Sequence, residues 1–260
     1  MVVYDSMGII ITITGQRGGN GRSVAAVNLS ASLALLERKT LLVDCDPRAY
    51  STLISGADFP PGSFDLSSVL TGKVDLAGAV LKTRLGFMDV LPSSFNLFHA
   101  AARLSRNAGS ERILRALLRE LKAEYDYIIV DPPPSYSFLT VMAMASADWL
   151  VLPFHCTPEA VQDLRSFLWM VHHVKGSFQR DLKIAGAFFN QCSSRDDIDF
   201  FLEGKDLRGV EKMVFKSFIP RDNALVTASR LGQPVALFDI ETPGARAYLD
   251  LAIELISFFN

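Results

Sequence analysis

The stretch IIITITGQRGGNGRSV, residues 9–24, decides the fold of this chain. Residues 9–14 are apolar or β-branched, which predicts a buried strand, and a glycine-rich turn and the small residues of a helix start follow. The turn holds three residues without a Cβ atom: Gly18, Gly19 and Gly21. Their backbone N–H groups can therefore curl around an anion, toward which the next helix presents its positive end. This layout is that of a phosphate-binding loop.

Two side chains after the glycines complete this loop. Arg22 stands where such loops place a cation for the β- and γ-phosphates, and Ser23 stands where they place a hydroxyl for Mg²⁺. The match to the usual pattern G-x-x-x-x-G-K-[ST] is incomplete, because Gln16 replaces the first glycine and Arg22 replaces the lysine. Arginine keeps the positive charge of lysine but not its shape.

The composition is that of a globular protein with one large α/β domain. The 260 residues are 49% hydrophobic and 21% charged, and we expect residues 1–260 to form a single nucleotide-binding domain. A formal net charge of −2 gives no general attraction to nucleic acid, so DNA contacts would need a local basic patch. Three widely spaced cysteines argue against a disulfide framework, and the chain shows neither a signal peptide nor a long apolar segment. We therefore expect a cytoplasmic protein without a transmembrane segment.

Apolar runs and helical periodicities alternate along the chain. They predict strands at 9–14, 40–44, 86–92, 125–130, 149–153, 183–190 and 213–219. They predict helices at 25–39, 95–106, 110–122 with Ser110 as its cap, 158–174 and 242–259, and two short helices within 65–83. On the last long helix the apolar positions are Ala245, Leu249, Ala252, Ile253 and Ile256. This alternation predicts a doubly wound, mostly parallel sheet flanked by helices, with a ligand at the carboxyl edge of the strands.

Acidic residues stand at the ends of two of these strands. Asp44 ends the strand at 40–44 and Asp46 follows it, about 20 residues after the phosphate loop, although acids at such a turn also serve as caps. Asp131 follows the strand at 125–130, where phosphate-loop proteins carry an outer-shell partner of Mg²⁺. Three prolines after Asp131 hold the backbone in a rigid, non-helical form, which makes a simple capping role less favoured there.

Four segments together resemble the ParA/MinD family of ATPases. RGGNGRSVAAVNLSASLA at 17–34 is similar to their deviant phosphate loop K-G-G-x-G-K-[ST] and first helix, with both lysines replaced by arginine. LLVDCDPR at 41–48 is similar to their segment L-L-V-D-x-D-P-Q, and YDYIIVDPPPS at 125–135 is similar to their switch segment. Residues 219–255, which begin IPRDNALVTASRLGQPV, resemble their I-P-R-N segment and terminal helix.

This resemblance implies ATP or ADP with Mg²⁺ as the cofactors, and it implies a role for each matching residue. The nucleotide-binding set is the loop, the asparagine that reads adenine and the segment that closes over the base: Gln16, Arg17, Gly18, Gly19, Asn20, Gly21, Arg22, Ser23, Val24, Asn190, Pro220 and Arg221. The implied metal-site residues are Ser23, Asp44 and Asp131.

The resemblance also implies catalytic and DNA-contacting residues. Asp46 would orient the attacking water, and Arg17, at the position of the signature lysine, would cross the interface of a nucleotide-sandwich homodimer to the partner's phosphates. Arg221 matches an arginine of the family and Arg230 is an additional one in this chain; the two would either contact DNA phosphates or simply be solvated on the surface. Because arginine replaces lysine at both loop positions, we expect nucleotide binding with slow or absent hydrolysis.

Two functions remain open at this point. The first is a ParA-like ATPase for DNA partitioning or cargo positioning, which dimerises on ATP, binds DNA or another large surface non-specifically, and answers to a stimulating protein that the sequence does not identify. The second is a non-hydrolysing adaptor of a membrane-associated machine, such as polysaccharide secretion, that keeps the fold as a dimerisation device. A measurement of phosphate release separates the two.

Overall fold

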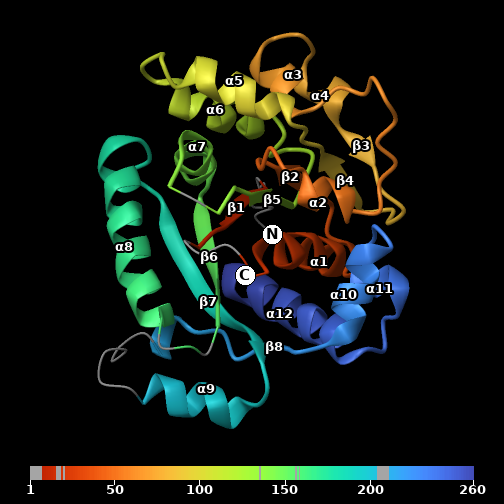
Figure 1. Ribbon diagram of the computed structural model, residues 1–260, viewed down its shortest axis with the longest axis vertical. Helices are drawn as coiled ribbons and strands as arrows, with labels where there is room; N and C mark the ends of the chain where they lie inside the picture. The colour runs from red at the N-terminus through yellow and green to blue at the C-terminus, as the bar shows by residue number, and fades with distance from the viewer. Residues whose placement is uncertain are drawn as a thin grey trace, which may run out of the picture.

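The computed structural model describes residues 8–15, 19, 21–134, 136–155, 157, 159–203 and 211–260 (Figure 1). Within them a single eight-stranded sheet has the order β3-β4-β2-β5-β1-β6-β7-β8. The strands are β1 (Ile9–Ile13), β2 (Thr40–Asp44), β3 (Leu81–Lys82), β4 (Met88–Leu91), β5 (Tyr127–Asp131), β6 (Trp149–Phe154), β7 (Lys183–Cys192) and β8 (Ile219–Pro220). Only the short edge strand β3 pairs antiparallel among the described strands, so the mostly parallel sheet is confirmed.

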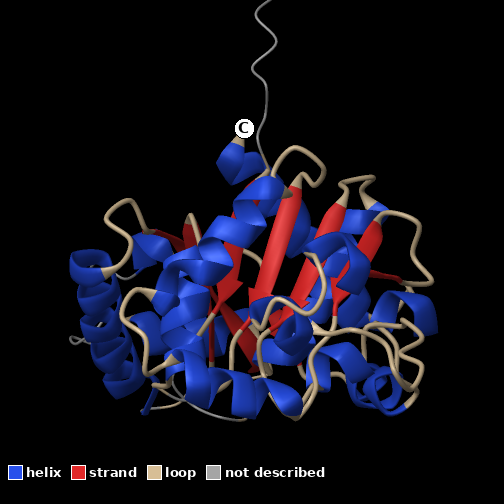
Figure 2. Cartoon of the chain, turned by 90° about the horizontal axis from the view of Figure 1, so that it is seen from above, coloured by secondary structure: helices blue, strands red, loops and turns tan. Residues whose placement is uncertain are grey.

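Helices cover both faces of the sheet, as Figure 2 shows from above. The helices on one face are α1 (Arg22–Leu35), α10 (Asn223–Arg230), α11 (Val235–Phe238) and α12 (Pro243–Phe259). Those on the other face are α3 (Leu66–Leu70), α4 (Leu76–Ala79), α5 (Asn96–Leu104), α6 (Ile113–Glu120), α7 (Phe138–Ser146), α8 (Glu159–Ser177) and α9 (Arg195–Leu202). The short α2 (Tyr50–Leu53) follows β2. Two hydrophobic cores result, one on each side of the sheet.

The small residues of α1 decide how closely it packs. Its alanines, Ser30 and Ser32 are buried and let its backbone lie close to the sheet and alongside α12 (Figure 1). The helix begins at Arg22, three residues before the predicted start at Ala25, and ends at Leu35. The earlier start matters because it brings the first turn of α1 directly to the glycine loop.

The order of the central strands positions the site. The strands β2, β5 and β1 are neighbours and run parallel, so their carboxyl ends meet at one edge of the sheet. At that edge Asp44 and Asp131 are register partners on β2 and β5. The loop after β1 emerges beside them.

Several sequence expectations are wrong in detail. Residues 213–219 do not form one strand: they contain the end of a 3-10 turn (Glu211–Met213), an isolated bridge at Val214 and the start of β8. Helix α7 was not predicted, because it is buried on nearly every side and therefore has no amphipathic period.

Two further corrections concern single side chains. Ser110 does not cap a helix; its Oγ donates to the carbonyl oxygens of Leu104 and Asn107 at 2.6 and 2.7 Å. On α12 the predicted core residue Ile253 is 47% exposed, whereas Tyr248 and Leu255 are buried. No helix in the described part of the chain combines the length and the apolarity that crossing a bilayer requires.

Candidate functional site

The amino end of α1 has the geometry that suits an anion. Gly21 precedes the helix with φ 70° and ψ 23°, a left-handed conformation that glycine adopts without strain. No side chain of the described residues caps this end and no acidic residue lies in the first turn of the helix, so its first N–H groups point toward a ligand position. Gly19 has φ 89° and open space around it. The other predicted loop residues, Gln16, Arg17, Gly18 and Asn20, lie outside the described residues.

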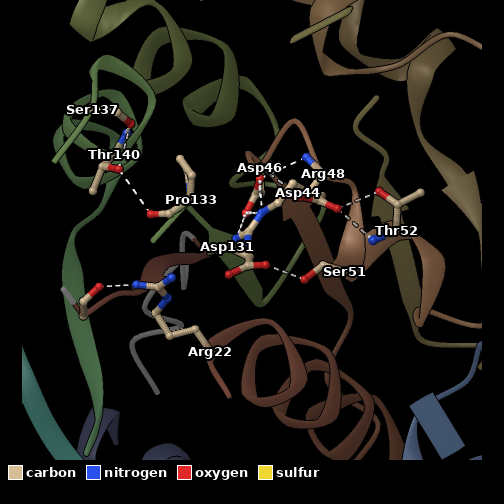
Figure 3. A network of polar contacts seen from close by, with 11 residues as sticks. Arg22, Asp44, Asp46, Arg48, Ser51, Thr52, Asp131, Pro133, Ser137 and Thr140 are labelled. Atoms are coloured by element: carbon tan, nitrogen blue, oxygen red, sulfur yellow. Dashed lines mark hydrogen bonds and ion pairs between the residues drawn. The ribbon is translucent and has the colours of Figure 1, made fainter. Parts of the chain in front are cut away.

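Arg22 is folded into the protein although it stands at the cation position of the loop. Its side chain is buried, its Nη1 donates to the carbonyl oxygen of Gly15, and its Nε is buried without a partner among the described residues (Figure 3). Burial lowers the pKa of Arg22, although the charges of Asp131 and Asp46 favour the protonated form. The guanidinium is therefore held by the backbone, and its Nε is a donor that no described residue accepts from, in the field of two acids.

Asp131 has the surroundings of an outer-shell metal partner. Ser51 Oγ donates to its Oδ2 at 2.5 Å, and Ser23 also forms a hydrogen bond with it. Burial raises the pKa of Asp131 to about 6, and the two serines and Arg22 lower it. Oδ1 of Asp131 is buried and accepts no hydrogen bond from the described residues. This oxygen and the Ser23 hydroxyl fit Mg²⁺, which prefers oxygen ligands and bound water.

Asp44 is tied into the backbone of the loop that follows β2. Its Oδ1 accepts from the N–H of Asp46 at 3.0 Å, and its Oδ2 accepts from both the N–H and the hydroxyl of Thr52 at 2.8 Å. Burial and the neighbouring charge of Asp131 raise the pKa of Asp44 to about 7, against these hydrogen bonds. Asp44 thus shapes the turn that carries Asp46, in addition to facing Asp131.

Asp46 forms a bidentate ion pair with Arg48. Nη2 of Arg48 lies 2.6 Å from Oδ2, and Nε lies 3.2 and 3.1 Å from Oδ1 and Oδ2. The backbone N–H of Arg48 donates to Oδ1 at 2.9 Å. Only 3% of the Asp46 side chain is exposed, against 66% of Arg48, so the guanidinium covers the acid from the solvent side. Figure 3 shows this pair next to Asp131.

A pocket of about 350 Å³ opens beside the amino end of α1. Its lining includes the residues expected around an adenine base and both arginines expected on DNA: Gly21, Val24, Asn190, Pro220, Arg221 and Arg230. Asn190 touches the loop itself, because a Cβ atom on Gly21 would lie 2.5 Å from its Nδ2. Arg221 is oriented by a 3.1 Å hydrogen bond from its Nε to the carbonyl oxygen of Gln191. The anion site and the pocket are therefore continuous.

Sequence reasoning missed three side chains of this site: Arg48, Ser51 and Thr52. Each contacts an acid that was predicted, and each lies within eight residues of Asp44. Arg48 carried a usable signal, because it stands where the related segment L-L-V-D-x-D-P-Q has glutamine. Ser51 and Thr52 carried none, because their contacts depend on the turn after β2.

Known proteins resemble this chain over most of its length. A family model described as an AAA domain matches residues 8–184. The chromosome partitioning protein ParA of Myxococcus xanthus is 35% identical, over 97% of this chain and 89% of its own length. The sporulation initiation inhibitor protein Soj of Bacillus subtilis is 33% identical, over 96% of this chain and 98% of its own length.

A solved structure extends the likeness to three dimensions. The cobyrinic acid a,c-diamide synthase of Mycobacterium smegmatis with bound ADP and magnesium superimposes with a TM-score of 0.80 at 27% identity, covering 97% of this chain and 96% of that one. The sequence and structural likenesses both span nearly the whole chain. The chain belongs to the ParA/MinD family.

Proposed function

We propose that this protein is a partitioning or positioning ATPase that binds ATP with Mg²⁺, forms a homodimer on ATP, and hydrolyses the nucleotide slowly. The observation that carries the proposal is the continuous site made by the amino end of α1, the buried Asp131 and the pocket beside Asn190. The names of the ParA and Soj relatives support the cellular role.

The ligand assignment rests on complementary chemistry along the site. The first turn of α1 offers N–H donors and a positive helix end to phosphate oxygens. Ser23 and the Asp131 oxygen that accepts no hydrogen bond from the described residues suit Mg²⁺, which would neutralise charge on the β- and γ-phosphates when bound. The pocket lined by Asn190 and Pro220 has the size for a purine base. ADP and magnesium in the synthase structure support the same pair of ligands here.

The position of Arg22 favours binding over turnover. A lysine at this position would be a compact charge on a flexible stem, able to follow the γ-phosphoryl group. Arg22 is instead bonded to the carbonyl oxygen of Gly15, and a guanidinium held in that way cannot strengthen its contact as the transition state forms. Slow hydrolysis follows from this difference.

Arg17 is proposed to act across the interface of the ATP-bound dimer. This residue stands at the signature position of the loop, and a cation there would reach the partner's phosphates as an arginine finger does. Light scattering should show a dimer with a slowly hydrolysed ATP analogue and a monomer with ADP. Arg17→Ala should weaken the ATP-dependent dimer, and an unchanged dimer would remove the proposed role of Arg17 across the interface.

Calorimetry with Mg²⁺ and ATP is the direct test of the function. Wild type should bind ATP, and Ser23→Ala should bind it more weakly only when Mg²⁺ is present. Ser257→Ala is a matched control, because Ser257 is exposed near the end of α12. Absence of ATP and ADP binding at millimolar nucleotide would refute the proposal.

A second candidate function is the non-hydrolysing adaptor of a membrane-associated machine. The burial of Arg22 and its bond to Gly15 favour it, because a dimerisation device needs only the bound state. Phosphate release by wild type with and without DNA separates the two candidates. Release that stays at the background rate, together with an ATP-dependent dimer, would support the adaptor.

A further inference from the structure

The pairing of Arg48 with Asp46 has a consequence for hydrolysis. In the reaction, the oxygen of a water bonds to the γ-phosphorus while the bond from that phosphorus to the β–γ bridging oxygen breaks, which gives ADP and phosphate, and the water's proton leaves with the phosphate. A carboxylate that orients this water must accept a hydrogen bond from it. Asp46 is the acid expected to do so.

Arg48 occupies the acceptor sites that this water would need. A carboxylate has about four lone-pair positions. Asp46 takes contacts from three donors of Arg48, the backbone N–H, Nε and Nη2, with Nε shared between the two oxygens. These contacts reach both oxygens, and the exposed guanidinium covers an acid that is itself buried. The contacts with Arg48 therefore occupy the acceptor positions of Asp46 that a water would use, and the guanidinium covers the approach to Asp46 from the solvent side.

The geometry of the turn strengthens the pair. Arg48 is two residues from Asp46 and separated from it only by Pro47, whose ring fixes the backbone φ angle. The guanidinium is therefore always near its partner, and a bidentate pair of this kind is stronger than an ordinary surface ion pair. Ser51 and Thr52, on the short helix α2 that follows directly, anchor this turn by hydrogen bonds to Asp131 and Asp44.

We propose that Arg48 is a positioning residue that holds Asp46 away from the attacking water and so slows ATP hydrolysis without weakening ATP binding. This inference rests on the proposed function. The effect of Arg48 differs from that of Arg22: Arg22 acts on the phosphates directly, whereas Arg48 acts through the side chain of Asp46. Glutamine at this position, as in the related segment, has no charge and cannot form the bidentate pair.

The test compares Arg48→Gln and Arg48→Lys with wild type for ATP turnover and for ATP affinity. Arg48→Gln should raise kcat about tenfold or more, because charge-assisted hydrogen bonds to the acid are lost, while KM and the calorimetric Kd change less than about twofold. Arg48→Lys should fall between the two, since an ammonium group cannot form two parallel bonds. Arg38→Gln is the matched control, an exposed arginine just before β2 at the opposite edge of the sheet.

A double variant separates positioning from a general change in structure. Adding Asp46→Asn to Arg48→Gln should abolish the gain in kcat, because the released acid is then absent. If wild type binds ATP but Arg48→Gln has an unchanged or lower kcat, the inference about Arg48 is wrong while the proposed function stands. A lower kcat would point to direct contact of Arg48 with phosphate. A gain that survives Asp46→Asn would overturn the inference as well. Absence of ATP binding to wild type would overturn the proposed function and the inference together.

Discussion

Asp44 and Asp131 face each other as register partners on the adjacent parallel strands β2 and β5, and both side chains are fully buried. Burial is the main cause that raises the pKa of Asp44 to about 7 and of Asp131 to about 6. Ionising both of two buried carboxyls on neighbouring strands has a high free-energy cost, because their negative charges repel each other. The two carboxyls therefore titrate as a pair near neutral pH. A cation at this edge of the sheet would favour the ionised pair.

The nucleotide-free protein should lose stability as the pH rises from about 5 to about 8. Both carboxyls have pKa values above those of the unfolded chain, so the folded state binds more protons between about pH 4 and pH 7. Their contribution is present at low pH and is lost as the pH passes through 6 to 7. Urea unfolding at both pH values measures it.

Asp131→Asn isolates the contribution of one of the two carboxyls to the pH dependence of stability. The amide oxygen can still accept from Ser51, and no charge remains to be buried. The free energy of unfolding at about pH 8 should rise by about 1–3 kcal/mol and depend less on pH. Asp250→Asn on the exposed face of α12 is the control. A variant less stable than wild type at high pH would contradict the assignment.

Ala49→Gly should stabilise the protein slightly. Ala49 has φ 55° and ψ 33°, a left-handed conformation that costs a residue with a Cβ atom about 1–2 kcal/mol. Glycine relieves this strain but loses about 0.4–1 kcal/mol through the greater freedom of the unfolded chain, which leaves a net gain of about 0.5 kcal/mol. Ala102→Gly is the matched control on the exposed face of α5, where the same change should lower the stability by about 1 kcal/mol. Equal losses at the two sites in thermal unfolding would argue against strain at Ala49.

Gly21→Ala should damage the site more than the fold. The new Cβ would lie 2.5 Å from Nδ2 of Asn190, and the φ of 70° would strain any other residue. We expect a loss of about 1–3 kcal/mol in stability and a larger relative loss in ATP affinity, because Asn190 and the amino end of α1 must separate. Gly176→Ala is the control, since open space surrounds Gly176 on α8. Normal ATP affinity of Gly21→Ala in calorimetry would show that this contact is not part of the site.

The sequence alone predicted the elements at the centre of the sheet. The strand at 40–44 was predicted with its observed limits; β1 and β6 differ from prediction by one residue at one end, and β5 begins two residues later and ends one residue later than predicted. Short, fully apolar runs with polar ends specify buried parallel strands well. The acids at the ends of β2 and β5 could be placed for the same reason, because parallel neighbours end at one edge.

Contacts made by turns could not be predicted. The bond from Ser51 to Asp131 joins residues 80 positions apart and depends on the left-handed Ala49, which no pattern indicates. The ion pair of Arg48 with Asp46 likewise requires the observed turn. Helix α7 was missed for the opposite reason, since burial on nearly every side removes the periodicity that reveals a helix.

DNA binding, where it occurs, should be weak and sensitive to salt. Arg221 and Arg230 line the pocket beside α1 on a protein of net charge −2, so few phosphates would be neutralised. Raising the salt concentration from about 50 to about 200 mM should lower the affinity for non-specific duplex DNA, and Arg221→Ala with Arg230→Ala should reduce the slope by about two phosphate contacts. An affinity independent of salt would exclude phosphate contacts as the mechanism.

Arg22→Lys tests whether the arginine itself limits hydrolysis. Arg22 is 6% exposed and donates to the carbonyl oxygen of Gly15, so its charge is fixed before a nucleotide arrives. Lysine lacks the second arm of the guanidinium and keeps three rotatable donors, so its charge can move with the γ-phosphoryl group. Contacts that strengthen only in the transition state raise kcat rather than affinity. Turnover should therefore rise about tenfold while ATP affinity stays equal or falls, because lysine offers fewer donors to the bound ground state than a guanidinium does.

Two comparisons make this result decisive. Arg38→Lys changes the same residue type just before β2 and should leave turnover unchanged. Arg22→Lys combined with Arg48→Gln should increase kcat more than either change alone, because one acts on the phosphates and the other on Asp46. Rapid hydrolysis by wild type that Arg22→Lys leaves unchanged would show that the loop accommodates arginine without cost. If Arg22→Lys binds ATP but hydrolyses it more slowly than wild type, the guanidinium of Arg22 contributes to catalysis. Slow hydrolysis by wild type would then have to arise from the ion pair of Asp46 alone.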